Sequence, residues 1–376
     1  MTFFPLHPRG GKAPRVRCLL PALLCCFCLL PLHAQPAPEP VTPSPEEPRR
    51  TYGVALTTEA QWHTRTGEVR WMNLLELEGS VRLWRGATAE AATLSTLSCG
   101  HDKEAVWQDH SCINAPSRGL RVAHLGIGQE WARPRLTTYV GLRGADEDYF
   151  NTPLAGLFTG ASMGCLPTVN DNFCVNVYPL SALGLHVEWE ATPALRLRSS
   201  LYNGKASDRL DEQLRFRPRA DGLIYMGSAE LSPQRYAAWP LPGTYVLGWN
   251  VGHHHRDPAF GRHTQWGFWL VAEQPVARMA ASQLTVGLTL AQEYKQPEAA
   301  KSYYGAQIGW TDLGRMKAAV ALSAARAFYR EGHETNFELT ASLPLVTRFS
   351  LQPSLHYYRT DGHSHFVPQL RLSFEL

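Results

Sequence analysis

Short segments in which apolar and polar residues alternate recur along this chain, and they limit the folds that it can adopt. In the segment 194–203 the leucines fall on one side and the arginines fall on the other. The segments 337–343 and 369–376 alternate in the same way. Successive side chains of a β-strand point to opposite faces, so each segment would have one apolar and one polar face. The pattern predicts an all-β fold.

Sixteen such segments follow residue 50, and no amphipathic helix of convincing length separates them. The predicted strands are 52–62, 72–84, 89–98, 119–131, 135–144, 182–191, 194–203, 223–232, 244–253, 264–273, 283–293, 303–311, 315–327, 334–343, 347–358 and 366–376.

The connections between these strands alternate in length. Those after even-numbered strands are mostly short, as in RGA, ARP, TP, TDLG and PLV, with 233–243 and 274–282 as longer exceptions. Those after odd-numbered strands include the long segments 99–118, 145–181 and 204–222. Outer-membrane barrels have short periplasmic turns and long extracellular loops, a rhythm that a soluble β-sandwich or propeller would not explain. We therefore expect a transmembrane antiparallel β-barrel of about 16 strands.

The first 50 residues differ in composition from the rest. Residues 1–34 combine a basic start, an apolar run of 15 residues and a small residue at Ala34, as in a secretory signal peptide. The run is short for a transmembrane helix, which needs about 20 residues. Residues 35–50 are proline-rich and polar, and cannot bury a core. We expect a signal peptide (1–34), a periplasmic leader (35–50) and one barrel domain (51–376).

Removing the signal peptide changes the charge balance of the chain. The signal carries four of the 36 basic residues and none of the 33 acidic residues, so the mature chain is close to neutral. The basic balance of the whole sequence therefore indicates no nucleic-acid partner.

The cysteines that remain after residue 34 are Cys99, Cys112, Cys165 and Cys174, and they fall in two predicted extracellular loops. An even number of cysteines in an exported protein favours disulfides. We expect the bridges Cys99–Cys112 and Cys165–Cys174, while other pairings between the loops stay open because four cysteines allow three connectivities. For Cys165 and Cys174 the spacing excludes a CxxC redox site, and a metal site there would have only two thiolates and no nearby histidine.

The polar faces of the predicted strands supply candidate residues for the lumen. Charged side chains are costly on the lipid face of a barrel but tolerated inside it. The residues expected to line a solute path are Glu76, Arg82, Trp84, Arg143, Glu188, Arg196, Arg198, Trp269 and Glu273.

This set allows two interpretations. The residues can form an ordinary solvated pore wall. They also suit sugars, which present hydroxyl edges to donors and acceptors and apolar C–H faces to aromatic rings.

No catalytic residue, cofactor or metal site is predicted. Ser181 and His186 would face opposite sides of a strand, and the histidines at 253–255 are interpreted as a polar loop run.

Two longer passages carry a family resemblance. The first is YVGLRGADEDYFNTPLAGLFTGASMG (139–164), and the second is VYPLSALGLHVEWEATPALRLRSSLYNGKAS (177–207), with its YP-x-x-ALG strand entry and YNG strand end. Shorter pieces lie at 243–252, 266–276 and 350–358. Together these passages resemble the carbohydrate-selective porin family of the OprB type.

The resemblance implies a sixteen-stranded porin in the outer membrane of a Gram-negative bacterium, through which mono- or small oligosaccharides diffuse without an energy source. We also expect contact with outer-membrane lipid, no cofactor and no enzymatic activity, and a homo-oligomer is left open. By the same analogy the loop 145–181 folds inward and narrows the channel, and its cysteines would hold the shape of the channel mouth.

The chain also departs from the family. It is short for such a porin, and each of two loops holds a cysteine pair. The positively charged wall of the family carries over only to Arg82, Arg143, Arg196 and Arg198. Three alternatives stay open: a general non-selective porin, an outer-membrane barrel enzyme such as a lipid or ester hydrolase, and a structural or adhesive barrel with a closed lumen.

Overall fold

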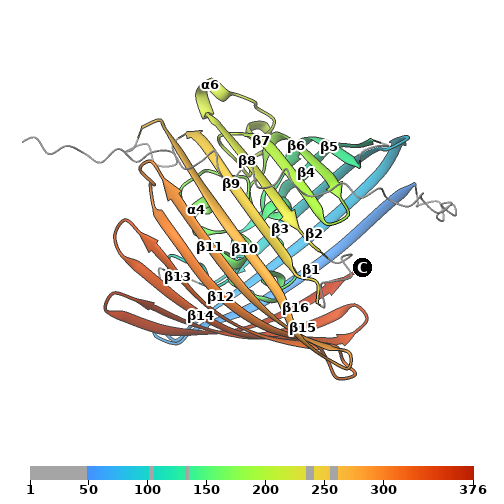
Figure 1. Ribbon diagram of the computed structural model, residues 1–376. Helices are drawn as coiled ribbons and strands as arrows, with labels where there is room; N and C mark the ends of the chain where they lie inside the picture. The colour runs from blue at the N-terminus through green and yellow to red at the C-terminus, as the bar shows by residue number, and fades with distance from the viewer. Residues whose placement is uncertain (1–48, 101–105, 132–134, 234–240, 255–260) are drawn as a thin grey trace, which may run out of the picture. The chain divides into compact units, whose positions relative to one another are not determined.

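Sixteen antiparallel strands close into one barrel (Figure 1). The computed structural model describes residues 49–100, 106–131, 135–233, 241–254 and 261–376. Each strand pairs with its neighbours in sequence, and β1 pairs with β16 to close the ring. The strands are β1 (Arg50–His63), β2 (Glu68–Trp84), β3 (Ala87–Cys99), β4 (Arg118–Trp131), β5 (Leu136–Arg143), β6 (Ala182–Thr192), β7 (Leu195–Asn203), β8 (Leu223–Leu231), β9 (Thr244–His254), β10 (His263–Met279), β11 (Ser282–Tyr294), β12 (Ala300–Leu313), β13 (Ala318–Tyr329), β14 (His333–Val346), β15 (Phe349–Thr360) and β16 (His363–Glu375).

The predicted fold class is confirmed, and a strand occupies each of the predicted places. The largest difference is in β10, which continues to Met279, so the long connection predicted at 274–282 is wrong. The register shifts between Pro275 and Ala277, which marks an irregularity in the β10–β11 ladder. Proline has no N–H for the ladder and is tolerated at such a bulge, so the strand continues past it. The predicted signal peptide and nearly all of the predicted leader lie outside the described residues.

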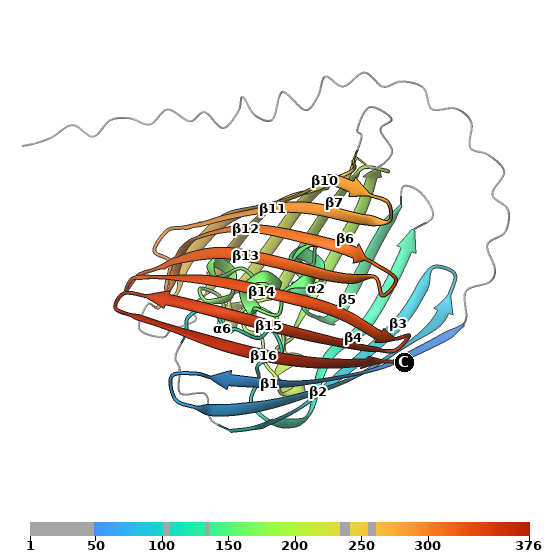
Figure 2. The ribbon, with the colours of Figure 1, turned by 90° about the horizontal axis from the view of Figure 1, so that it is seen from below.

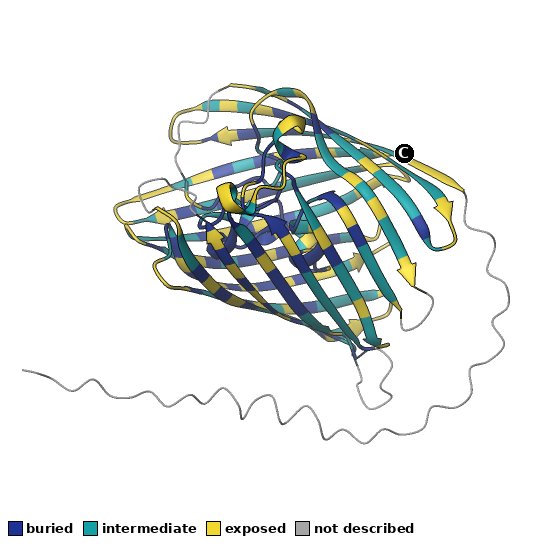
Figure 3. Cartoon of the chain, turned by 90° about the horizontal axis from the view of Figure 1, so that it is seen from above, coloured by how far each residue is buried: buried dark blue, intermediate teal, exposed yellow. Residues whose placement is uncertain are grey.

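Side chains alternate between the two faces of the wall. On β14 Phe337 and Leu339 are exposed on the outer face, whereas Glu338 between them is buried inside. Figure 3 shows buried and exposed positions following each other along the strands. The outer face therefore presents the apolar residues, as a lipid-facing wall requires.

None of the helices in the described ranges is both long and apolar enough to span a membrane.

The strands of the wall are shortest where the longest loops connect them. β5, β7 and β8 have 8, 9 and 9 residues, whereas β2 and β10 have 17 each. The β5–β6 loop (144–181) lies within the ring of strands in Figure 1 and Figure 2. The short helices of these loops are α2 (Asp146–Tyr149), η2 (Ala155–Leu157), α3 (Ala161–Gly164) and α4 (Pro167–Asn170) in the β5–β6 loop, and α5 (Leu210–Gln213) and α6 (Pro218–Asp221) in the β7–β8 loop.

Candidate functional site: the constricted lumen

The β5–β6 loop builds a hydrophobic core inside the barrel. Its apolar side chains, such as Tyr149, Phe150 and Phe173, are buried against inward-facing residues of the wall. The wall residues of this core come from β7 to β13, and include Tyr202, Ile224, Met226, Val246, Trp269, Ala291, Tyr303 and Ala325. The loop therefore occupies the lumen on the β7–β13 side, and it folds inward as the family resemblance led us to expect.

Two wall glutamates hold the same loop through hydrogen bonds. Glu273 on β10 accepts from Thr152 Oγ1 at 2.5 Å and from two further backbone N–H groups at 3.0 and 3.2 Å. Glu338 on β14 accepts from Thr159 N and Oγ1 at 2.6 and 2.9 Å and from Gly160 N at 3.1 Å. An ionised carboxylate only accepts hydrogen bonds, and bonds to it are stronger than neutral ones. The carboxylates thus fix the loop at two points of the wall.

The β3–β4 loop, described from residue 106, also folds into the lumen. Glu334 at the extracellular end of β14 accepts from the backbone N–H groups of Trp107 and Gln108 at 3.0 and 2.7 Å. The backbone N–H of Cys112 donates to Thr159 O of the β5–β6 loop at 2.8 Å. The two loops are therefore bonded to each other as well as to the wall.

Charged side chains of both signs line the wall toward the periplasmic ends of β6, β7 and β8. Arg198 donates to Glu188 at 2.7 Å and to Glu230 at 2.8 Å. Arg196 lies 3.4 Å from Glu190 and 3.5 Å from Glu188. Arg198 stands opposite Glu188 and Arg196 stands opposite Glu190 in the strand register, and opposite charges at such positions attract. We call these five residues the charged ladder.

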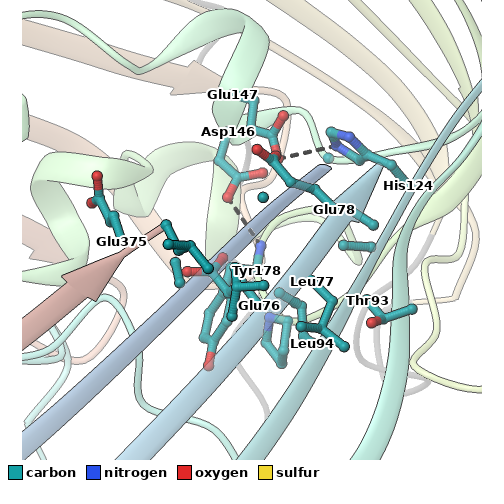
Figure 4. A pocket seen from close by; sticks show the side chains of 18 of the residues that line it. Glu76, Leu77, Glu78, Thr93, Leu94, His124, Asp146, Glu147, Tyr178 and Glu375 are labelled. Atoms are coloured by element: carbon teal, nitrogen blue, oxygen red, sulfur yellow. Dashed lines mark hydrogen bonds and ion pairs between the residues drawn. The ribbon is translucent and has the colours of Figure 1, made fainter. Parts of the chain in front are cut away.

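A cavity of about 830 Å³ lies between β1 to β4, the end of β16 and the β5–β6 loop (Figure 4). Its acidic side chains are Glu76 and Glu78 from β2, Asp146 and Glu147 from α2, and Glu375 from β16. The volume falls within the roughly 300–1,000 Å³ of small-molecule sites. We call it the acidic cavity.

Two contacts fix the α2 side of the acidic cavity. His124 Nε2 lies 3.0 Å from Glu147 Oε1, and Asp146 Oδ2 accepts from the backbone N–H of Tyr178 at 3.2 Å (Figure 4). Burial, and then repulsion by Glu147, raises the pKa of Asp146 to about 6. Asp146 therefore changes charge at a mildly acidic pH.

The structure places several predicted path residues on the inner face. Glu76 lines the acidic cavity, and Arg82 lies on the same face of β2. Glu188, Arg196 and Arg198 belong to the charged ladder. The structure brings the last three together, whereas Glu76 lies with other acids several strands away.

Trp269 and Glu273 were wrongly predicted to line the path. Trp269 is 0% exposed, with its ring 5.1 Å from that of Phe150, and Glu273 is buried as a loop anchor. A side chain at Gly248 would overlap the Trp269 indole, so this close packing needs glycine there. The folded β5–β6 loop covers both residues, and strand alternation alone does not reveal such a cover.

Arg143 is also largely covered, because it serves the loop. Its guanidinium donates to both carboxylate oxygens of Asp148 at 2.6 to 3.0 Å and lies 5.0 Å from the centre of the Tyr139 ring. The planar guanidinium group matches the spacing of the two oxygens of one carboxylate. Arg143 thus positions α2.

Trp84 faces outward, contrary to the prediction. The register shifts between Arg82 and Trp84, and Trp84 then pairs with Ala87, which pairs with Gln129 on the outer face of β4. The indole N–H donates to Gln129 Oε1 at 2.9 Å, and the side chain is 58% exposed. A bulge places an extra residue on one strand, so the alternation counted from Glu76 fails after it.

The predicted disulfides do not form in the described part of the chain. Cys99, Cys112 and Cys174 are free thiols. Cys99 is exposed at the end of β3, whereas Cys112 is folded into the lumen, where its sulfur lies 3.5 Å from Arg371 Nη2. Cys174 Sγ donates to Ala206 O at 3.7 Å. Wall glutamates and the loop core therefore hold the loops in place of bridges.

Sequence patterns missed the residues that hold the loops and most of the acidic cavity. Glu338 and Glu78 could be assigned to the polar face of a strand, but not to a role. The acids of α2 stand in the run DED at 146–148, whose charge density was the available signal. Glu375 and Glu334 gave no signal beyond strand alternation.

Comparisons with known proteins agree with this geometry. The family model of the carbohydrate-selective porin, OprB family, matches residues 70–366. A high-pH structure of Pseudomonas putida OprB superposes with a TM-score of 0.75 at 16% identity, covering 87% of this chain and 94% of that one. Pseudomonas aeruginosa OpdK with vanillate gives a TM-score of 0.51 at 10% identity, covering 87% and 98%. No curated protein matches the sequence. At these identities the solved structures support the fold alone.

Proposed function

The chain belongs to the carbohydrate-selective porins of the OprB family, and from this membership we propose that its sugar path runs along the acidic cavity and the charged ladder. It is a porin of the Gram-negative outer membrane, through which sugars pass by diffusion. The observation that carries the proposal is the filled lumen: the β5–β6 loop occupies the β7–β13 side and leaves polar side chains on the rest of the wall.

The chemistry of the two surfaces suits sugars. The charged ladder offers guanidinium donors beside carboxylate acceptors, and the acidic cavity offers further acceptors. A sugar hydroxyl both donates and accepts, so neighbouring groups of opposite sign can bind it in sequence. Arg196 and Arg198 already have carboxylate partners, and a hydroxyl that replaces one of them makes a weaker bond, so we expect sugars to bind weakly, as passage requires.

The family match favours this function over a general porin, a closed barrel and a barrel hydrolase. The matching family and the structural neighbours are channels. One buried group resembles a hydrolase set: His186 Nδ1 lies 2.7 Å from Ser200 Oγ and 3.4 Å from Asp148 Oδ2. In a catalytic triad the serine and the acid contact different ring nitrogens. Here both contact Nδ1, so we propose that the chain has no enzymatic activity.

Several sequence predictions enter this proposal without a structural test. We propose that residues 1–34 direct export and are removed, and that residues 35–50 are a periplasmic leader to the barrel domain 51–376. We further propose that the outer face contacts outer-membrane lipid and that the barrel works without a cofactor. A homo-oligomer remains compatible with this arrangement.

Liposome swelling tests the proposed path. We expect monosaccharides to enter vesicles containing the protein faster than amino acids of equal size. Arg196→Ala with Arg198→Ala should slow sugar entry by about three- to tenfold. This is less than the rate effect that the loss of a full charge-assisted hydrogen bond would give, because water in the path replaces part of the lost contact. The matched control is Arg209→Ala with Arg215→Ala, which removes two exposed arginines of the β7–β8 loop that also pair with a carboxylate.

Three outcomes would contradict the proposal. Vesicles that do not swell would indicate a closed barrel, and equal rates for sugars and amino acids would indicate a general porin. Unchanged sugar rates in the ladder variant would remove the charged ladder from the path.

A further inference from the structure

A pocket of about 690 Å³ lies at the ends of β13 to β16, the orange-to-red strands of Figure 1, away from the lumen. Its charged and polar lining includes Arg326, His333, Arg359, Asp361 and His363. The turns beside it follow the odd-numbered strands β13 and β15, so they lie at the extracellular end of the barrel.

The two arginines of this pocket face outward. Arg326 on β13 is exposed and alternates with buried Ala325 and Ala327. Arg359 on β15 is exposed and follows buried Tyr358. Both arginines therefore lie on the lipid side of the wall.

Strand register places the two arginines in one row. Arg326 stands opposite Thr335, Thr335 stands opposite Arg359, and Arg359 stands opposite Ser364. The arginines are two strands apart, which separates their Cα atoms by roughly 10 Å. Side chains of that length can reach a common group from both sides. The row thus presents two guanidinium groups with two hydroxyls.

An aromatic row lies directly beneath the arginine row, one residue pair closer to the membrane centre. Phe337 stands opposite Tyr357, and Tyr357 stands opposite Phe366. Their ring centres are 6.1 and 4.8 Å apart. Aromatic belts mark the membrane interface, and one residue pair along a strand is about 6–7 Å. The arginine row therefore lies at the depth of the outer-leaflet headgroups.

The charges of this pocket are not balanced internally. Within the described ranges neither Arg326 nor Arg359 forms an ion pair, and Arg326 instead lies 5.1 Å from the centre of the Phe328 ring. The pocket's carboxylate, Asp361, lies 3.4 Å from His333 Nε2. Two guanidinium groups at a membrane interface without a carboxylate partner favour an anion there.

We propose that this pocket binds the phosphorylated headgroup of a glycolipid in the outer leaflet. Guanidinium groups match phosphate oxygens with paired hydrogen bonds, and Thr335 and Ser364 can donate to the same group. The aromatic row and the leucines below it, Leu339 and Leu355, would contact the acyl chains. The site is separate from the solute path, because it lies on the opposite face of the wall.

Native mass spectrometry of the full barrel in detergent tests the proposal with two probes. The probes are bisphosphorylated lipid A and dephosphorylated lipid A with the same acyl chains. We expect the wild-type protein to retain the phosphorylated lipid about tenfold better, as charge-assisted contacts predict. Arg326→Ala with Arg359→Ala should bring this ratio close to one. Arg326→Lys with Arg359→Lys should give an intermediate ratio, since lysine keeps the charge but not the paired geometry.

The matched control is Arg315→Ala with Lys317→Asn, which removes two exposed positive charges from the periplasmic turn after β12. Asparagine suits the left-handed conformation of Lys317, whose φ is 52°. This control should keep the wild-type ratio. A heat-modifiability gel confirms that each variant is folded, and the lysine pair supplies the test if the alanine pair does not fold.

Equal retention of both lipids by the wild type would overturn the proposal, and so would an unchanged ratio in the alanine pair. Displacement of the lipid by millimolar inorganic phosphate would also overturn it, by showing a site for free phosphate. Sugar swelling rates should stay unchanged in the arginine variants, which separates this test from that of the solute path.

Discussion

Two glutamates of the lumen have different roles, and the residues around each of them decide its role. Glu338 is buried and accepts three hydrogen bonds from the β5–β6 loop. Glu188 lies half-buried on the wall with two arginines around it. Both occupy the polar face of a strand, so alternation alone predicts the same role for both. Contact with a folded loop makes the first an anchor, whereas the second stays partly exposed on the wall.

The anchor role of Glu338 predicts a loss of stability in Glu338→Gln. The two N–H groups of Thr159 and Gly160 donate to different oxygens of Glu338, so the glutamine keeps an acceptor for one of them and turns its NH₂ group toward the other. We expect a cost of about 1–3 kcal/mol, which is typical for a buried polar group that loses its partner. A lower melting temperature in detergent would show it.

Glu331→Gln is the control, because Glu331 is exposed in the turn after β13. If both variants melted with the wild type, Glu338 would not be an anchor.

Asp146 predicts a pH dependence. Its pKa is raised from 3.8 to about 6, so the folded protein binds the proton of this carboxyl more tightly than the unfolded chain does. The stability from this group is fully present below pH 3.8 and is lost as pH rises through about 6. Asp146→Asn mimics the protonated form at all pH values. The difference in melting temperature between Asp146→Asn and the wild type should therefore grow in favour of the variant from pH 4 to pH 8.

The size of this effect should be between about 1 and 3 kcal/mol, because one pKa unit corresponds to about 1.4 kcal/mol and the side chain is only half-buried. Asp312→Asn is the matched control: it removes an exposed carboxylate near the end of β12, away from α2, and asparagine suits the left-handed φ of 56° there. A difference that is constant with pH would contradict the assignment.

At the scale of elements, the strands follow from sequence and the loops do not. Each strand needs only a segment in which apolar and polar residues alternate. The neighbouring strands on either side then satisfy the hydrogen bonds of its backbone. The two local failures, the end of β10 and the orientation of Trp84, both occur at register shifts. A bulge depends on how two strands pair, so the residues of one strand do not specify it.

The core between the β5–β6 loop and the wall predicts the effect of Trp269→Ala. Removing the indole leaves a cavity beside Phe150 and Tyr149, and large-to-small changes of this kind cost about 3–5 kcal/mol. We expect a lower melting temperature together with larger fluctuations of single-channel current, because the loop loses its packing.

Trp310→Ala is the matched control, since Trp310 is exposed on the outer face of β12. A quiet channel in Trp269→Ala would show that the glutamates alone hold the loop.

At the scale of the whole molecule, negative charge gathers in one part of the lumen. The acidic cavity brings five acids together with one arginine, Arg348, whereas the charged ladder, five strands along the barrel at β7, pairs its arginines with carboxylates. Charges that line a narrow passage raise the local concentration of the opposite ion. The cavity should therefore attract cations.

Glu76→Gln with Glu78→Gln tests this field. We expect the reversal potential in a salt gradient to shift toward anion selectivity, and the shift to shrink at high ionic strength because salt screens exposed charges. Glu130→Gln with Glu331→Gln removes two charges outside the acidic cavity and should leave the reversal potential unchanged. Equal shifts in both variants would mean that net charge, not the cavity, sets selectivity.

The sequence by itself determined the barrel and its family. Alternating segments, the rhythm of short and long connections and a few family passages depend on local residues and their spacing, which any reader of the chain can count. The inward face of Glu76 and of Arg196 followed from the same count.

Only the tertiary structure decided which inward residues meet the lumen. The β5–β6 loop folds back onto strands far away in the chain, so Trp269 and Glu273 become its core and its anchor while the charged ladder stays uncovered. Strand pairing likewise aligned Arg326 with Arg359 across three strands. These contacts join residues distant in sequence, and local periodicity carries no information about them.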